Sequence, residues 1–358
     1  VQIKDDNDTI IGFSAYFDSG CSDESACNYN PYSVNDVDGA CAYIDDCGEC
    51  GGPGPDEGFD CDYSKNGWIQ PYSEKNQDNL QHSINEGLEA GFDDWTKINS
   101  GEALSLSGIR ITTDSGFSKG AATWQPAKWV WSLLGTAVKS NHVDLFTNTK
   151  VESIEDSGEY YVVNTTRGKV QARYIINATE SYTALLHPSF TNKLYPKQTQ
   201  GFFAKDGPTN MKERVAMGGT HGWFGRVPRT GGYIAGSDGK RVAHNKAGVI
   251  DPSRFITKFL VGHVHEYFGA APSTVQREWT CTAGFTDDEY PIVGTIDNKR
   301  QYIIAGMCGS GSGVHFNASK HIVCKIADIK NIDYYPEQYF SPNRILNPNT
   351  HKWPEIEN

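Results

Sequence analysis

The sequence predicts an α/β protein with a small disulfide-rich module near its N-terminus. Three observations lead to this prediction. Residues 301–316 contain a buried strand, a glycine loop and the start of a helix. Amphipathic helices and short strands follow one another through residues 70–176. Six of the nine cysteines lie between Cys21 and Cys61, in a stretch with few large apolar residues.

The cysteine-rich module, residues 21–62, has too few apolar residues to fold around a core of its own. Disulfides replace such a core in small extracellular domains, so we predict a disulfide framework. A zinc site is the competing interpretation for Cys47 and Cys50, but no second CxxC pair and no nearby His complete a set of four ligands. The predicted disulfide residues are Cys21, Cys27, Cys41, Cys47, Cys50 and Cys61.

Acidic residues are concentrated in the same part of the chain. Residues 1–62 hold fifteen of the 44 Asp and Glu residues and one lysine, and the whole chain has a formal net charge of −12. An acidic surface of this kind argues against nucleic acid or an anionic membrane as a partner. It either keeps the module soluble or binds cations, and Asn35, Asp36 and Asp38 offer oxygen ligands that suit calcium.

Further features indicate a secreted or extracellular protein. The sequons at Asn7, Asn164, Asn177 and Asn317 are candidate glycosylation sites. Disulfides persist in the same oxidising compartments. No apolar run approaches the roughly 20 residues that a membrane-spanning helix needs, so we expect no membrane span.

The segment after the module begins with helices. Leu80, Ile84, Leu88 and Phe92 recur every four residues, with Trp95 after them, and this spacing predicts a helix with one apolar stripe. A second helix is predicted to begin at residue 126, since proline suits a first helical turn. Its apolar residues are Val130, Leu133, Leu134, Ala137 and Val138. Strands are then predicted at residues 143–146, 151–154, 160–165 and 170–176, with a hairpin turn at residues 166–168.

The later segments predict further strands and two more helices. Residues 195–248 are rich in glycine and aromatic residues and contain short strand-like runs. A helix is predicted from Asp251 and Pro252, an N-cap followed by a first-turn proline. Its apolar face is Phe255, Ile256, Phe259, Leu260 and Val264. Strands at residues 276–281 and 302–305, a last helix to about residue 329 and a tail rich in Pro and Asn complete the chain.

The glycine loop, residues 306–314, gives the strongest indication of chemistry. Glycines let a backbone approach a ligand closely, and the N-terminus of a helix presents free N–H groups to an anionic or electron-rich group. The spacing is not the dinucleotide-binding GxGxxG, because Val314 stands where the third glycine would be. A plain tight turn between strand and helix is the alternative.

Two groups of motifs occur in a defined order. The later group is Trp279, Gly284, Thr286, Asp288, a Pro-Ile-Val-Gly run and the glycine loop. The earlier group is Trp124-Gln-Pro at a helix start, then a turn and an apolar strand that ends in Asn-Ala-Thr at residue 179. Together these motifs, over about residues 70–330, resemble the D-amino-acid-oxidase superfamily of FAD-dependent oxidoreductases.

The resemblance implies the two-domain fold of FAD-linked oxidoreductases. The FAD-binding part would be residues 63–190 and 281–330, the mostly antiparallel substrate domain residues 191–280, the remnant of a second FAD-binding strand residues 1–20, and the tail residues 331–358. The implied cofactor contacts are Asp5, Val151, Ala178, Thr179, Cys281, Gly306, Gly309, Ser310, Gly311, Ser312, Gly313 and Val314.

Two residues have more specific implied roles. Cys281 stands seven positions before Asp288, where sarcosine-oxidase-like members carry a cysteine that holds the flavin through a thioether. A cysteine that merely packs, or one in a disulfide, is the alternative. Arg226 lies where the family's substrate sheet faces the substrate, so its guanidinium would clamp a carboxylate, unless it forms a surface salt bridge.

The sequence departs from the family pattern at two places. Glu180 follows Thr179 where glycine is usual, and its carboxylate either approaches the phosphates or turns to solvent. No strand–GxGxxG–helix is present to bind the pyrophosphate. Either residues 1–5 are the family's second strand, with Asp5 on the ribose and about 30 residues before Val1, or the chain is degenerate and binds no FAD.

The function implied by the resemblance is oxidation of a small amine or amino acid by hydride transfer to the flavin. A second hypothesis is a non-catalytic extracellular structural or interaction protein that keeps the fold and binds a protein partner through the cysteine-rich module.

Overall fold

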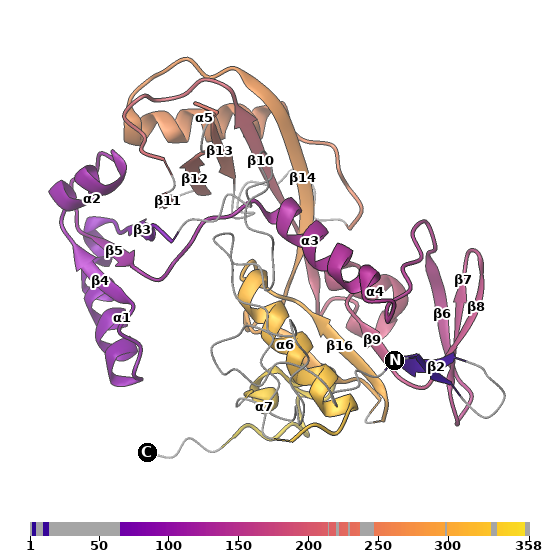
Figure 1. Ribbon diagram of the computed structural model, residues 1–358. Coiled ribbons are helices and arrows are strands. Elements are labelled where there is room, and N and C mark those ends of the chain that lie inside the picture. The colour runs from indigo at the N-terminus through magenta and orange to yellow at the C-terminus, as the bar shows by residue number, and fades with distance from the viewer. Residues whose placement is uncertain are drawn as a thin grey trace, which may run out of the picture.

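The computed structural model of the chain describes residues 2–4, 10–13, 65–213, 215–219, 222–227, 230–236, 247–297, 299–330 and 335–354 (Figure 1). Its strands are β1 (Gln2–Lys4), β2 (Ile10–Phe13), β3 (Trp68–Pro71), β4 (Trp95–Ile98), β5 (Ser115–Ser118), β6 (Val151–Asp156), β7 (Tyr161–Thr165), β8 (Gly168–Ala172), β9 (Ile175–Asn177), β10 (Tyr195–Ala204), β11 (Ala216–Gly219), β12 (Gly222–Arg226), β13 (Tyr233–Gly236), β14 (Val275–Phe285), β15 (Ile292–Thr295) and β16 (Gln301–Ala305). Its α-helices are α1 (Gln77–Glu89), α2 (Ser100–Ser107), α3 (Pro126–Lys139), α4 (Thr183–Leu186), α5 (Arg254–Phe268), α6 (Gly311–Ile326), α7 (Glu337–Phe340) and α8 (Asn343–Leu346). Short 3-10 helices are η1 (Glu74–Asn76), η2 (Glu180–Tyr182) and η3 (Pro188–Phe190).

An eight-stranded sheet forms the larger part of the described structure. Its strand order is β14-β10-β13-β12-β11-β3-β5-β4. The described neighbours in it pair antiparallel, apart from β3 and β11, which run parallel. Strands β10 and β14 are the longest pair and align Tyr195 with Phe285. The mostly antiparallel sheet that the sequence predicted is therefore confirmed.

Helix α5 covers one face of this sheet (Figure 1). Ile256, Leu260 and Val264 recur at helical spacing and are buried against the core, since that stripe removes apolar surface from water. The predicted start was wrong: the helix begins at Arg254 after an N-cap at Ser253, two positions later than expected. Phe255, expected on the apolar face, points outward and is 75% exposed.

A second, smaller sheet has the order β15-β16-β9. Strand β16 pairs parallel with β9 and antiparallel with β15. All five residues of β16 are buried. Tyr302 and Ile304 pack on one face, in a cluster with residues of α6. Ile303 and Ala305 pack on the other face, in a cluster with Phe190. Burial on both faces explains why this strand reads as an unbroken apolar run.

A third sheet, β6-β7-β8, is built from two hairpins. The predicted turn between β7 and β8 is confirmed, and Gly168 there has a φ of 146°, which a residue with a Cβ rarely adopts. The segment predicted as one strand at residues 170–176 is instead divided between β8 and β9, which belong to different sheets.

Helices α1 and α3 differ from the sequence prediction in what they bury. Leu80 and Ile84 are buried in α1, but Leu88 and Phe92 are exposed and Trp95 belongs to β4. Helix α3 begins at Pro126 as predicted, yet none of its residues is buried. The expected strand at residues 143–146 is not a strand in the structure. Exposed apolar side chains along α3 are Val130, Trp131, Leu133, Leu134 and Val138.

The boundary between the two parts also differs from the prediction. Residues 63–190 were assigned to the cofactor-binding part, but β3, β4 and β5 are strands of the large sheet. The large sheet is therefore assembled from two separated segments, before α3 and after residue 194. The tail is folded against the smaller sheet, where α7 contacts β15. No helix among the described residues is both long and apolar enough to span a membrane.

Candidate functional site

The carboxyl ends of two parallel strands meet at one edge of the smaller sheet. Ala178 and Thr179 follow β9, and the glycine loop follows β16, its parallel neighbour. Ligands of α/β proteins bind outside the carboxyl ends of parallel strands. The structure therefore brings together the two segments that the sequence assigned to the cofactor, residues 178–179 and 306–314.

The backbone of the glycine loop is set by residues in the left-handed region. Gly306, Cys308 and Gly309 have φ values of 67°, 52° and 88°. The Cys308 N–H donates to the Gly284 carbonyl at 3.0 Å, so the loop is fixed to the end of β14. The Cys308 thiol donates to the Gly306 carbonyl at 3.2 Å. The sequence analysis assigned no role to this thiol.

Helix α6 starts within the glycine loop and leaves its N-terminus open. Its N-cap, Ser310, makes no side-chain capping bond. Gly309, Ser310, Ser312 and Gly313 are exposed, and a Cβ built on Gly313 would meet no atom within 4 Å. Among the described residues no side chain caps this end, so the first N–H groups and the positive end of this 16-residue helix suit an anionic or electron-rich group.

The Glu180 side chain turns to the backbone beside this loop, rather than to phosphates or solvent as the sequence suggested. Its carboxylate accepts hydrogen bonds from the N–H groups of Gly284 at 2.8 Å, Gly306 at 2.5 Å and Met307 at 3.4 Å. These donors come from β14 and from the glycine loop. Sequence reasoning noted the unusual residue but could not predict its partners.

Cys281 lies on the face of the large sheet opposite α5. On the α5 side, Glu278 accepts a hydrogen bond from Thr257 of the helix, and Thr280 is buried. Cys281 is exposed and unpaired, with Thr199 of β10 at 3.7 Å from its sulfur atom, and Trp279 is 39% exposed on the same side. Cys281 precedes Gly284, whose carbonyl accepts from the Cys308 N–H of the glycine loop, by three residues, which is about 10 Å along a strand.

Other predicted site residues lie elsewhere. Val151 opens β6, where it pairs with Thr165. The predicted clamp, Arg226, donates through Nη1 to the carbonyls of Pro208 at 3.0 Å and Met211 at 3.2 Å, so its guanidinium braces a loop. Its assignment as a substrate clamp is therefore not supported by these contacts.

The candidate glycosylation sites differ in the structure. The Asn177 side chain is 3% exposed and its amide donates to the Tyr302 carbonyl at 2.7 Å, which leaves no room for a glycan in the folded chain. The Asn164 amide donates to Ser153 at 2.8 Å and to Glu155 at 2.7 Å. Asn317 is exposed on α6. Asn7, Asp5, the cysteines of the module and the calcium candidates Asn35, Asp36 and Asp38 lie outside the described residues.

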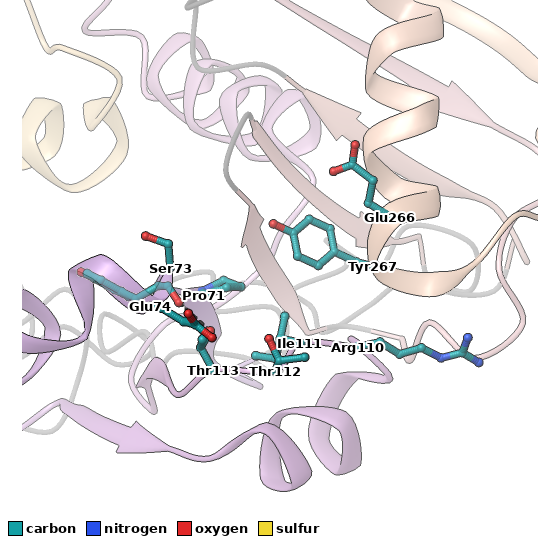
Figure 2. Close-up of a pocket in the computed structure, with 10 residues that line it drawn as sticks. Pro71, Ser73, Glu74, Arg110, Ile111, Thr112, Thr113, Glu266 and Tyr267 are labelled. Carbon is teal, nitrogen blue, oxygen red and sulfur yellow. Dashed lines mark hydrogen bonds between the residues drawn. The ribbon is translucent and has the colours of Figure 1, made fainter.

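A cavity of about 390 Å³ lies in another part of the molecule (Figure 2). It is lined by residues 71–74, residues 110–113 and the last turn of α5, Glu266 and Tyr267. None of these residues belongs to the strand ends or the glycine loop. Figure 2 shows the Tyr267 ring directed toward residues 71–74, whereas the Arg110 side chain extends away from them. No cluster of three or more His, Cys, Asp or Glu suited to a metal occurs among the residues that the structure describes.

The parallel strand ends, the glycine loop at the start of α6 and the mostly antiparallel large sheet are features of an α/β protein of the cofactor-binding kind. Residues 55–323 match the family model described as FAD dependent oxidoreductase, and the chain belongs to this family. No curated protein matches the chain in sequence.

Several solved structures share the fold. L-proline dehydrogenase from P. horikoshii superposes with a TM-score of 0.67 at 16% identity, over 79% of this chain and 77% of that one. Glycine oxidase from Geobacillus kaustophilus gives 0.65 at 16% identity, over 79% and 76%. L-amino acid deaminase from Proteus vulgaris, with its specific insertion deleted, gives 0.61 at 19% identity, over 79% and 74%.

The residues at this site fit the flavin end of FAD. The open N-terminus of α6 offers donors to an electron-rich ring edge, and the glycines leave space beside the loop. A strand–GxGxxG–helix for the pyrophosphate does not occur in the sequence.

Proposed function

We propose that the protein binds FAD at the carboxyl ends of β9 and β16 and oxidises a small amine or amino acid. The observation that carries this proposal is the uncapped N-terminus of α6. The glycine loop places it beside the end of β9 and is hydrogen-bonded to the end of β14. The similarity in fold to a proline dehydrogenase, a glycine oxidase and an amino acid deaminase supports the substrate class.

The bound flavin would accept a hydride from the carbon beside the amine nitrogen, leaving an imine that water hydrolyses. The role of the chain is to bind and orient. The N–H groups at the start of α6 would stabilise negative charge on the electron-rich edge of the ring. The face of β10 and β14 opposite α5, which carries Trp279, would shield the reacting carbon from water.

We further propose that Cys281 is the point of covalent attachment, if the cofactor is covalent. Its thiol is exposed, free of a disulfide and on the face of β14 opposite α5, three residues before the Gly284 that binds the glycine loop. Cys308, the other thiol at this edge, is directed back to its own loop through the Gly306 carbonyl. We also propose that the protein is secreted, and that its cysteine-rich module is disulfide-bonded and binds calcium. Mass spectrometry of the alkylated, unreduced protein would test the disulfides.

The first experiment is an absorbance spectrum of the purified protein, before and after acid precipitation. The bands of an oxidised flavin support the proposal, and colour that stays with the precipitate indicates covalent attachment. In that case Cys281→Ser releases the colour to the supernatant, while the control Cys324→Ser on α6 does not. A colourless protein that takes up no added FAD would contradict the proposal and favour a non-catalytic binding protein.

A further inference from the structure

Glu180 has a backbone conformation that its residue type disfavours. Its φ is 45°, in the left-handed region, where a side chain with a Cβ is destabilised and glycine is not. Such a residue persists only when surrounding interactions hold it there. The contacts of the Glu180 carboxylate are therefore the first place to look for what maintains this conformation.

Three backbone N–H groups converge on the Glu180 carboxylate, and we call them the amide nest: those of Gly284, Gly306 and Met307. Oε1 accepts from Gly284 and Met307, and Oε2 accepts from Gly306. Successive N–H groups beside a left-handed residue form a concave site for anions, and Gly306 has the required φ of 67°. Hydrogen bonds to a charged acceptor are about twice as strong as neutral ones.

The amide nest joins segments that are far apart in sequence. Gly284 belongs to β14, three residues after Cys281, and the other two donors open the glycine loop. There is also no space for a larger group: a Cβ on Gly284 would lie 3.2 Å from both Glu180 oxygens.

We infer that Glu180 is the positioning residue of the cofactor site, a tethered anion that fills the amide nest and fixes the glycine loop to β14. This inference rests on the proposed function only for the identity of the cofactor. Through this contact the N-terminus of α6 and the Cys281 face hold one relative position before any ligand binds. Without the carboxylate, the bond from the Cys308 N–H to the Gly284 carbonyl still joins the loop to β14, but the loop is held less tightly and the nest accepts a small free carboxylate instead.

The decisive test uses the cofactor-free protein and acetate as the probe. Glu180→Ala lowers the melting temperature, and acetate raises it again in proportion to the occupancy of the emptied nest. The matched control is Glu289→Ala, because Glu289 is a second glutamate with positive φ, 58°, but is exposed. Acetate stabilises neither Glu289→Ala nor the unchanged protein. An equal response of all three proteins to acetate, or none in Glu180→Ala, overturns the inference.

A second variant covers the case in which Glu180→Ala does not fold. Glu180→Gly removes the same carboxylate but suits the left-handed backbone. Its yield on refolding rises with acetate, whereas that of Glu289→Gly does not change with acetate. A yield of Glu180→Gly that is independent of acetate contradicts the tethered-anion role.

Titration with FAD, followed by quenching of flavin fluorescence, measures the positioning effect. Glu180→Ala binds FAD about tenfold more weakly, the factor expected when one hydrogen bond to a charged group no longer holds the competent loop. Acetate restores the affinity. Unchanged affinity in Glu180→Ala overturns the positioning role. If the unchanged protein binds no FAD, the proposed function fails, while the acetate response still decides the inference.

Discussion

At the scale of single residues, the Arg344 guanidinium joins the tail to the turn that contains Asp288. The Arg344 side chain is 0% exposed and bonds both oxygens of Asp288, at 2.7 and 3.0 Å, and the Tyr290 carbonyl at 2.6 Å. Burial by itself would raise the pKa of Asp288, but the hydrogen bonds from Arg344 and from the Tyr290 backbone outweigh it and lower the pKa below 3.8.

We expect Arg344→Leu to lower the free energy of unfolding by about 1–2 kcal/mol at neutral pH, since it leaves the Asp288 carboxylate without its partner, although solvent screens this carboxylate, which is 34% exposed. Because the folded pKa of Asp288 is depressed, this contribution is present above pH 3.8 and is lost as the pH falls through the folded pKa. Urea unfolding at neutral and acidic pH measures it. The exposed Arg173→Leu is the control. An equal loss in both variants would rule out the ion pair as the cause.

His187 gives a second pH dependence with the same direction. Burial lowers its pKa from 6.5, and its Nε2 lies 2.8 Å from Asn177 Oδ1. The unfolded chain therefore binds more protons than the folded chain below pH 6.5, and stability falls as the pH decreases through that range. We expect His187→Gln to flatten this slope in thermal unfolding. A slope as steep as that of the unchanged protein would show that another group titrates.

At the scale of secondary-structure elements, α5 shows that not every apolar residue of an amphipathic helix is buried. Leu260 is 1% exposed and Phe255 is 75% exposed on the same helix. Leu260→Ala is expected to cost about 2–5 kcal/mol of unfolding free energy, because it leaves a cavity in the core. Phe255→Ala is expected to change it by less than about 0.5 kcal/mol. Chemical denaturation of both variants measures the difference, and similar losses would contradict the observed orientation of α5.

The sequence predicts elements better than it predicts their partners. Helical spacing located α1, α3 and α5, and the turn at Gly168 located the β7–β8 hairpin, because these patterns depend on neighbouring residues. The pairing of β3 with β11 depends on residues far apart in the chain, and both strands are only four residues long. Helix α3 buries none of its residues, and periodicity could not predict this, because it does not specify what a helix packs against.

The candidate site follows the same division. Glycines and a helix start predicted the loop, since they act locally. The direction of the Glu180 side chain depends on β14 lying beside the end of β9, so no local pattern could reveal the amide nest. The contacts of Arg226 could not be predicted for the same reason, because its carbonyl partners, Pro208 and Met211, lie on another segment.

At the scale of the whole molecule, the cofactor site draws on both sheets. Strand β14 belongs to the large sheet and ends at the glycine loop of the small one (Figure 1). We expect FAD at a hundredfold excess over its Kd to raise the unfolding free energy by about 2.7 kcal/mol. Calorimetry with and without FAD tests this, with ATP as the control ligand. Stabilisation by ATP alone would indicate a nucleotide site rather than a flavin site.

The large sheet also has a consequence for how the chain reaches its native state. Trp68 pairs with Ala216, and the strands that follow Trp68 in sequence complete an edge of the same sheet. Contacts between residues so distant in sequence form slowly, because a long loop must close before they gain any stability. Until then β3, whose other neighbour is the local strand β5, exposes an unpaired edge to other chains. Low concentration and slow dilution from denaturant should therefore favour recovery of native protein over aggregates.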